Sequence, residues 1–203
     1  MITEKEIIDF ENEIAGLFSE GLIKAPVHLR AGREAPLIHI FNKYAIGPDD
    51  YVFAFWDAHE ICLLKGVPRT VLKQAIMDGR SIALCFPEQR IFCSGIVGSL
   101  MGVAAGAAWA VKQKGEKGRV FLFCGDMSAE TGIFHEAVKY AVNFDLPAVF
   151  VVSDNAVSVM TDTRQAWGSP HAWFKGTRFE AKIEYFKYHN TWPHSGVGKL
   201  IKF

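Results

Sequence analysis

The stretch RVFLFCGDMSAE, residues 119–130, decides the fold class. Residues 120–124 are four apolar residues and one cysteine, and this run ends abruptly at Gly125-Asp126. An unbroken apolar run of this length is typical of a strand that is buried on both faces, as in a parallel sheet. Open α/β sheets hold their ligands at the carboxyl ends of such strands, so Asp126 is expected to be an oxygen ligand. The alternative interpretation is an ordinary solvated turn at Gly-Asp.

A second apolar run, LPAVFVVS at 146–153, ends in the same way at Asp154-Asn155. The residues between the two runs, 130–143, have the apolar spacing of an amphipathic helix. Strand, helix and strand of these lengths predict a right-handed parallel crossover, which brings Asp126 and Asn155 to one edge of the sheet. A carboxylate, an amide oxygen and a main-chain carbonyl just beyond Asn155 suit magnesium. A helix opening near Ser128 is expected to add N–H groups for a diphosphate.

The remaining elements follow from local signals. Thr3 and Glu6 form a capping box that begins a helix, and Pro68 begins another that runs to about residue 79. Strands are expected at 49–56 and 90–95, and a helix that ends near Gly115. Together they predict an α/β fold with a parallel sheet and helices on both faces. We expect a single domain over 1–203, with an N-terminal helix and a short aromatic C-terminal tail.

Composition argues weakly against two classes of partner. Lys plus Arg equals Asp plus Glu at 22 each, so the chain lacks the basic surplus that nucleic acid or an anionic membrane favours. The uncharged stretch Ser94–Val111 is long enough for a membrane helix, but its glycines at 98, 102 and 106 favour a buried helix packed closely against a neighbour. The four cysteines lack metal-ligand spacing, which predicts buried free thiols and a cytoplasmic protein.

The residues from Gly125 to Asn155 resemble the thiamine diphosphate signature, Gly-Asp-Gly followed further along by Asn-Asn. With GIFHEA (132–137) and Leu146-Pro147, the chain is similar to the alpha subunits of two-component 2-oxo acid dehydrogenases of the pyruvate, branched-chain and acetoin types. Similarity continues upstream in VHLRAGREA (27–35), DDYVF (49–53), His59, Lys65-Gly66 and GIVG (95–98). The chain is identified as a shortened and divergent member, similar over roughly residues 9 to 167.

The resemblance implies a thiamine diphosphate and magnesium site. Asp126, Asn155 and the Val157 carbonyl are expected to bind the metal, and Gly125, Met127 and Ser128 the diphosphate. Gly95 and Val97 are expected to offer main-chain groups to the cofactor's aminopyrimidine, and Trp56 is a further cofactor contact. His59 is expected to face the substrate, a small 2-oxo acid, although a lone histidine is as often a core residue. The reaction implied is decarboxylation with acyl or aldehyde transfer.

Several residues depart from the family pattern. Met127 replaces the third glycine of the signature, Ser153 a common Glu, and Arg33 the family's Gln. Asp57 stands where the family usually has an Arg that holds the diphosphate. A carboxylate there is expected to repel the diphosphate and weaken its binding.

The resemblance also implies a partner. In the family, a Glu from a separate beta subunit activates the aminopyrimidine, and Glu34, Glu60 and Glu130 do not lie in that context here. We therefore expect an α2β2 assembly that pairs through the helix carrying glycines 98, 102 and 106. The alternative is a non-catalytic or regulatory relative that scaffolds an active partner subunit. A dinucleotide-binding domain is disfavoured, because no Gly-x-Gly-x-x-Gly follows a strand.

Overall fold

The computed structural model describes residues 2–168 and 172–195, which divide into two compact units. The first unit takes its described residues from 1–48, 56–95 and 189–203. The second unit consists of 49–55 and the described residues of 96–188. The first unit is therefore assembled from three separate parts of the chain.

Helices dominate the first unit. α1 (Glu4–Ser19) begins at the predicted capping box, in which the Thr3 amide donates to the Glu6 carboxylate at 2.8 Å. It is followed by α2 (Glu34–Lys43), α3 (His59–Leu64) and α4 (Arg69–Met77), the last of which begins directly after Pro68 as predicted. β2 (Cys85–Phe86) and β3 (Ile91–Ser94) pair antiparallel across η1 (Pro87–Gln89).

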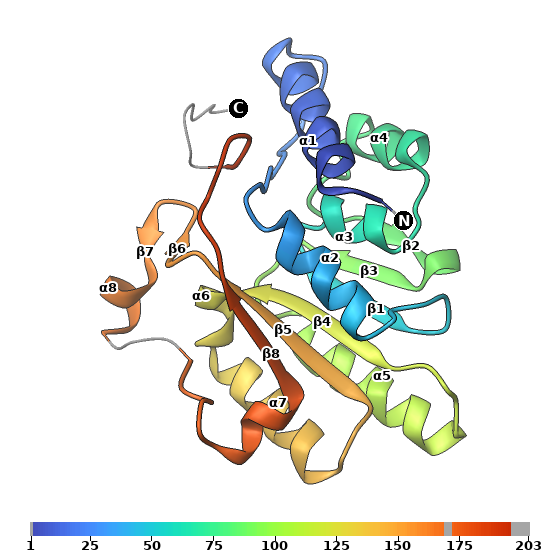
Figure 1. The fold of residues 1–203 in the computed structure, drawn as a ribbon, viewed down its shortest axis with the longest axis vertical. Helices are drawn as coiled ribbons and strands as arrows, with labels where there is room; N and C mark the ends of the chain where they lie inside the picture. Colours follow the sequence, from blue (N-terminus) through green and yellow to red (C-terminus); the bar gives the residue numbers. More distant parts are fainter. Residues whose placement is uncertain (1, 169–171, 196–203) are drawn as a thin grey trace. The chain divides into compact units, whose positions relative to one another are not determined.

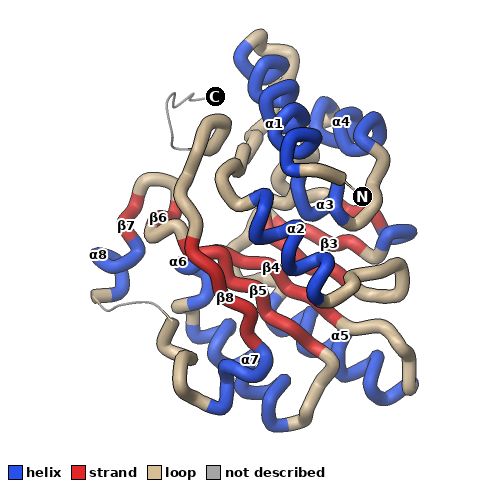
Figure 2. Tube along the Cα trace, viewed as in Figure 1, coloured by secondary structure: helices blue, strands red, loops and turns tan. Residues whose placement is uncertain are grey.

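A parallel sheet forms the centre of the second unit. β1 (Tyr51–Phe55), β4 (Val120–Gly125), β5 (Ala148–Asp154) and β8 (Ile183–Lys187) lie in the order β1-β4-β5-β8, and each neighbouring pair is parallel. Figures 1 and 2 show β4, β5 and β8 side by side. The apolar runs that predicted β4 and β5 are buried along almost their whole length. The predicted α/β class and the parallel crossover are both confirmed.

Two long helices cover one face of this sheet. α5 (Met101–Lys114) and α7 (Gly132–Asn143) pack against each other, and α5 also packs against β4 and β5 (Figure 1). α5 ends at Gly115, whose φ of +65° gives the left-handed cap that glycine favours. None of the helices in the described part of the chain has the length and apolarity that crossing a bilayer requires.

The prediction of a buried helix carrying glycines 98, 102 and 106 is wrong in part, because Gly98 is buried but lies before α5, which begins at Met101. The buried face of α5 consists of Met101, Ala104, Ala105, Ala108 and Val111. Gly102 and Gly106 are exposed, and a Cβ built on either meets no other heavy atom within 4 Å. The alanines supply the close packing against the sheet, so the glycines are left on the outer side of the helix.

Short elements complete the second unit. They are α6 (Asp126–Ala129), β6 (Val157–Ser158), β7 (Thr161–Asp162), α8 (Thr163–Trp167) and η2 (Arg178–Lys182). β8 was not predicted, because its sequence IEYFK mixes charged and aromatic residues. All four cysteines are free thiols, as predicted, but Cys85 is exposed, so the expectation that all are buried is wrong.

Candidate functional site

Asp126 lies where the sequence predicts it, directly after the last residue of β4. Gly125 is the register partner of Ser153, so the ends of β4 and β5 are level with each other. The Asp126 side chain is only 2 % exposed, and its Oδ2 accepts a hydrogen bond from Thr163 Oγ1 at 2.6 Å. The charge of a buried carboxylate must be compensated by hydrogen-bond donors or by a cation. A bound metal ion would be such a cation.

Asn155 and Val157 follow β5 at the same edge of the sheet. The Val157 amide donates to Asn155 Oδ1 at 3.3 Å, which forms a local turn directly after the strand. α6 packs against both β5 and β6, so the structure brings Asp126 together with the segment that holds Asn155 and Val157. The predicted convergence of these three residues on one edge therefore has the required topology.

The three predicted diphosphate residues, Gly125, Met127 and Ser128, lie at the start of α6 or just before it. A helix does begin near Ser128, as expected, but it is α6 with only four residues, and α7 begins separately at Gly132. The Ser128 carbonyl accepts from Thr131 Oγ1 at 2.7 Å, and the Met127 sulfur accepts from the Trp167 indole at 2.9 Å. Main-chain N–H groups, rather than a helix dipole, are what this turn can offer an anion.

The predicted oxygen ligands fit a hard divalent cation by their chemistry. One carboxylate, one amide oxygen and one main-chain carbonyl leave room for the phosphate and water oxygens that magnesium favours. In the described residues, no three His, Cys, Asp or Glu side chains form a group that could hold a metal ion. A metal at this edge therefore depends on the mixed set of Asp126, Asn155 and Val157.

A second buried acid at this edge was missed by the sequence analysis. Asp154 is 3 % exposed, and its carboxylate accepts hydrogen bonds from the Tyr185 hydroxyl and from the Ala156 amide at 2.8 Å. Burial and the hydrogen bond to Asp154 raise the pKa of Tyr185 well above its usual value. The signal was present in the sequence, since Asp154 stands at the first Asn of the Asn-Asn pattern. Its partner could not be found without β8.

His59 lies in the first unit and is fully enclosed. Its Nδ1 lies 2.8 Å from Glu11 Oε1, and its Nε2 lies 2.9 Å from Ser81 Oγ. All three side chains are buried, so the ring bridges α1 and the loop that carries Ser81. In this arrangement His59 holds the core together, and contact with a substrate would require it to leave both partners.

The expectation that Asp57 presents an uncompensated anion is wrong. Its Oδ2 lies 2.9 Å from Arg33 Nη1 and 3.1 Å from Arg30 Nε, and all three side chains are buried. Although burial alone would raise the pKa of Asp57, the two guanidinium groups hold it well below its usual value. Asp57 is therefore ionised and neutralised within the first unit, and it points toward its arginines.

The other predicted cofactor residues are divided between the units. The Trp56 ring lies 5.8 Å from the ring of His28, whose pKa burial lowers to about 3. A Cβ on Gly95 would lie 3.3 Å from the Ile82 side chain, so this position favours glycine. Val97 belongs to the second unit and is 41 % exposed.

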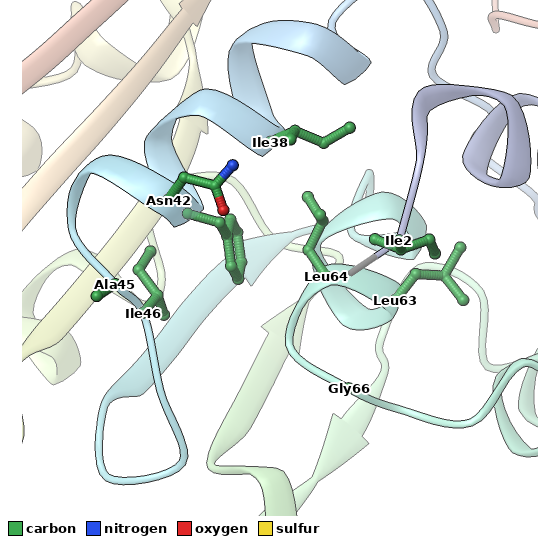
Figure 3. A pocket seen from close by; sticks show the side chains of 9 residues that line it. Ile2, Ile38, Asn42, Ala45, Ile46, Leu63, Leu64 and Gly66 are labelled. Atoms are coloured by element: carbon green, nitrogen blue, oxygen red, sulfur yellow. The ribbon is translucent and has the colours of Figure 1, made fainter.

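A separate apolar cavity in the first unit contains none of the predicted site residues. Its volume is about 710 Å³, and it is lined by Ile2, Ile38, Phe41, Asn42, Ala45, Ile46, Leu63, Leu64 and Gly66 (Figure 3). Asn42 supplies the one polar side chain of this lining, and no acid or base is among these residues. The cavity therefore offers no proton transfer or metal ligation, and the edge beside Asp126 remains the candidate site.

Comparison with known proteins shows the family to which this chain belongs. The family model described as "Dehydrogenase E1 component" matches residues 3–182. The alpha subunit of acetoin:2,6-dichlorophenolindophenol oxidoreductase from Bacillus subtilis is 29 % identical over 77 % of this chain and 49 % of its own length. The human testis-specific pyruvate dehydrogenase E1 alpha subunit is 28 % identical over 79 % and 43 %, and its Zymomonas mobilis counterpart 29 % over 77 % and 47 %. The chain spans about half the length of these relatives.

Proposed function

Because this chain belongs to the dehydrogenase E1 component family, we propose that it is the alpha subunit of a thiamine diphosphate-dependent enzyme acting on a 2-oxo acid. The observation that carries the proposal is the buried carboxylate of Asp126 at the end of β4, level with the end of β5 and next to the segment of Asn155 and Val157. A strand-end oxygen set of this kind is what a magnesium diphosphate requires.

Each residue of the edge has a distinct proposed task. Asp126, Asn155 and the Val157 carbonyl bind magnesium, and main-chain groups of Gly125, Met127 and Ser128 bind the diphosphate. Met127 is compatible with this task, because a main-chain contact does not depend on the side chain. When bound, the cofactor supplies a nucleophilic thiazolium carbon and an electron sink for decarboxylation of the 2-oxo acid.

Residues outside this edge complete the proposal. We assign Gly95, Val97 and Trp56 to the cofactor's organic part, following the resemblance. His59 is proposed to act on the substrate side. Its buried hydrogen bonds make this assignment testable, because the same residue also has a structural task.

The activating carboxylate is proposed to come from a beta subunit. Two of the three glutamates considered in this chain are already engaged: the Gly32 amide donates to both oxygens of Glu34, and Arg33 Nε donates to Glu60 at 2.6 Å. The third, Glu130, follows α6 and lies outside the activating context of the family. An α2β2 assembly would bring the missing group to the cofactor.

The outer side of α5 and α7 is proposed as the surface that the beta subunit covers. A groove of about 360 Å³ runs between the two helices, lined by Gly102, Ala105, Gly106, Ile133, Glu136, Ala137 and Tyr140. Ile133 and Tyr140 are each more than 40 % exposed, and Val103 is 53 % exposed. Exposed apolar side chains beside open glycines fit a helix that approaches closely, which supports the proposal that the partner covers this surface.

The experiment is a calorimetric titration with thiamine diphosphate and magnesium, made on the chain alone and with the co-expressed protein encoded beside it. Binding should be lost in Asp126→Asn, which keeps the shape and the hydrogen bond from Thr163. Asp145→Asn is the matched control, because this exposed acid lies before β5, at the opposite end of the strand. Equal binding by Asp126→Asn and the parent protein would sink the metal site.

One observation favours the alternative of a non-catalytic scaffold. Arg33 and Asp57, which stand at the family's Gln and Arg positions, form a buried ion pair with each other. They are therefore not directed at a ligand. A regulatory subunit would still assemble with its partner, but turnover would not change when Asp126 is substituted. The same Asp126→Asn variant therefore separates the two functions when activity of the assembled complex is measured.

A further inference from the structure

We infer that Thr163 is a positioning residue for the metal-binding carboxylate, and that it couples closure of the segment 156–167 to magnesium binding. The inference rests on the proposed function of Asp126. Thr163 Oγ1 donates to Asp126 Oδ2 at 2.6 Å, and the Thr163 side chain is fully buried. A short hydrogen bond from a buried hydroxyl to a carboxylate fixes the direction in which the carboxylate points.

The segment 156–167, here called the closing segment, returns to the site after leaving β5. It contains the β6–β7 hairpin and α8, and the base of the hairpin is joined by the Thr163 amide, which donates to the Ala156 carbonyl at 3.0 Å. Asp162 caps α8 by accepting from the Gln165 amide at 2.9 Å. The hydroxyl of Thr163 is thus presented to Asp126 from the start of a defined helical turn.

A second contact joins the closing segment to the turn after β4. The Trp167 indole donates to the Met127 sulfur at 2.9 Å, although the Trp167 side chain is 46 % exposed. Thr163 and Trp167 therefore hold the same two-residue stretch, Asp126-Met127, from opposite ends of α8. Of the two contacts, the buried one made by Thr163 is better protected from water and is the stronger link.

The tip of the hairpin adds little to the closed arrangement. Val159 lies at its turn with a φ of +57°, a region that β-branched residues rarely adopt. Its neighbour Met160 is 65 % exposed, so the tip of the hairpin gains little from packing. The closed position of the segment therefore depends on the packing of β6 against α6 and on anchors such as the buried Thr163.

A bound metal and the Thr163 hydrogen bond would connect the same two segments of the chain. A magnesium ion held by Asp126 and the Val157 carbonyl would join the turn after β4 to the closing segment, as Thr163 does. Coupling of this kind is reciprocal: what closes the segment strengthens metal binding, and metal binding slows its opening. Loss of the hydroxyl should therefore weaken magnesium binding while the rest of the fold remains intact.

Thr163→Val removes the hydroxyl and keeps the shape, and Thr163→Ser keeps the hydroxyl. Magnesium affinity is measured by calorimetry at a fixed thiamine diphosphate concentration, together with the co-expressed partner. We expect Thr163→Val to bind magnesium roughly tenfold or more weakly, as for loss of a hydrogen bond to a charged group, and Thr163→Ser to stay close to the parent protein. Equal affinities in all three proteins would overturn the inference.

Hydrogen exchange supplies a readout that is independent of activity. Amides of the closing segment should exchange faster in metal-free Thr163→Val than in the metal-free parent, and magnesium should slow them in the parent. If Thr163→Val does not fold, the parent comparison alone decides, and unchanged exchange of 156–167 on adding magnesium overturns the coupling. A parent protein that binds no magnesium contradicts the proposed function instead, so the two failures are distinguishable.

Discussion

Arg33 holds Asp57 at two points, donating from Nη1 to Asp57 Oδ2 at 2.9 Å and from Nη2 to the Asp57 main-chain oxygen. By the resemblance, this chain has a cation where the family has Gln and an anion where it has Arg. The two departures are therefore one compensated change, since each residue neutralises the other inside the first unit.

This pairing predicts that a second substitution recovers stability lost through the first. Asp57→Arg alone would place three buried guanidinium groups together and should cost roughly 3–5 kcal/mol in the free energy of unfolding. Adding Arg33→Gln, which restores the family pattern, should recover a large part of that loss. Urea unfolding measures both, and Arg69→Gln, in an exposed pair with Glu13, is the control expected to cost about 1 kcal/mol or less. A stable Asp57→Arg single variant would contradict the buried pairing.

Glu60 predicts a pH-dependent stability. Burial raises the pKa of Glu60 from 4.5 to about 8, because it outweighs the pairing with Arg33. Between these two pH values the folded state keeps a proton on Glu60 that the unfolded state has released. The contribution of Glu60 to the free energy of unfolding therefore falls as pH rises from about 4.5 to about 8. Glu60→Gln should remove this decline and gain stability relative to the parent above pH 8. Thermal unfolding from pH 5 to pH 9 tests it, and parallel curves for the two proteins would refute it.

The role of His59, structural or catalytic, can be determined by measuring both stability and turnover of a variant. His59→Gln breaks at least one of the buried hydrogen bonds to Glu11 and Ser81, so it should cost about 2–4 kcal/mol in unfolding free energy. Denaturant unfolding checks this value, and kinetics of the assembled complex check the substrate role. A variant that keeps its stability but loses turnover would place His59 at the substrate rather than in the core.

The groove between α5 and α7 predicts a selective loss of assembly. Gly102→Leu should leave the subunit folded, because the site of the new Cβ is open and Leu favours a helix over Gly by about 1 kcal/mol. The leucine would fill the groove and block a partner helix. Size-exclusion chromatography with the co-expressed partner measures the assembly.

Gln113→Leu is the matched control for this groove, since residue 113 is also exposed on α5 but does not line the groove. It should assemble like the parent protein. If Gly102→Leu assembles equally well, the partner does not use this surface.

The strong periodic signals were enough to predict the central crossover, because buried strands and an amphipathic helix are specified by local sequence. β4, α7 and β5 each lie within a few residues of their predicted bounds. The buried side of α5 could not be distinguished from its exposed side in the sequence, because small residues line both sides. The contacts show that the alanines are the buried residues.

The partners of the site residues could not be read from the sequence. Thr163 reaches Asp126 across 37 positions, and Tyr185 reaches Asp154 across 31. Such pairs depend on how the closing segment and β8 return to the sheet, and these elements carry no strong periodicity of their own. The neutralisation of Asp57 was missed for the same reason, since Arg33 lies 24 positions away.

The return of the chain to the first unit has a consequence for the order of folding. The Ser195 amide donates to the Leu29 carbonyl at 2.8 Å, and the Leu29 amide donates to Ser195 Oγ, a pair 166 positions apart. During translation, the first unit's helices emerge early, yet this pairing must wait until the second unit has been synthesised. Contacts of such long range slow folding, because a large loop must close before they form. The first unit to emerge is therefore the last to be completed.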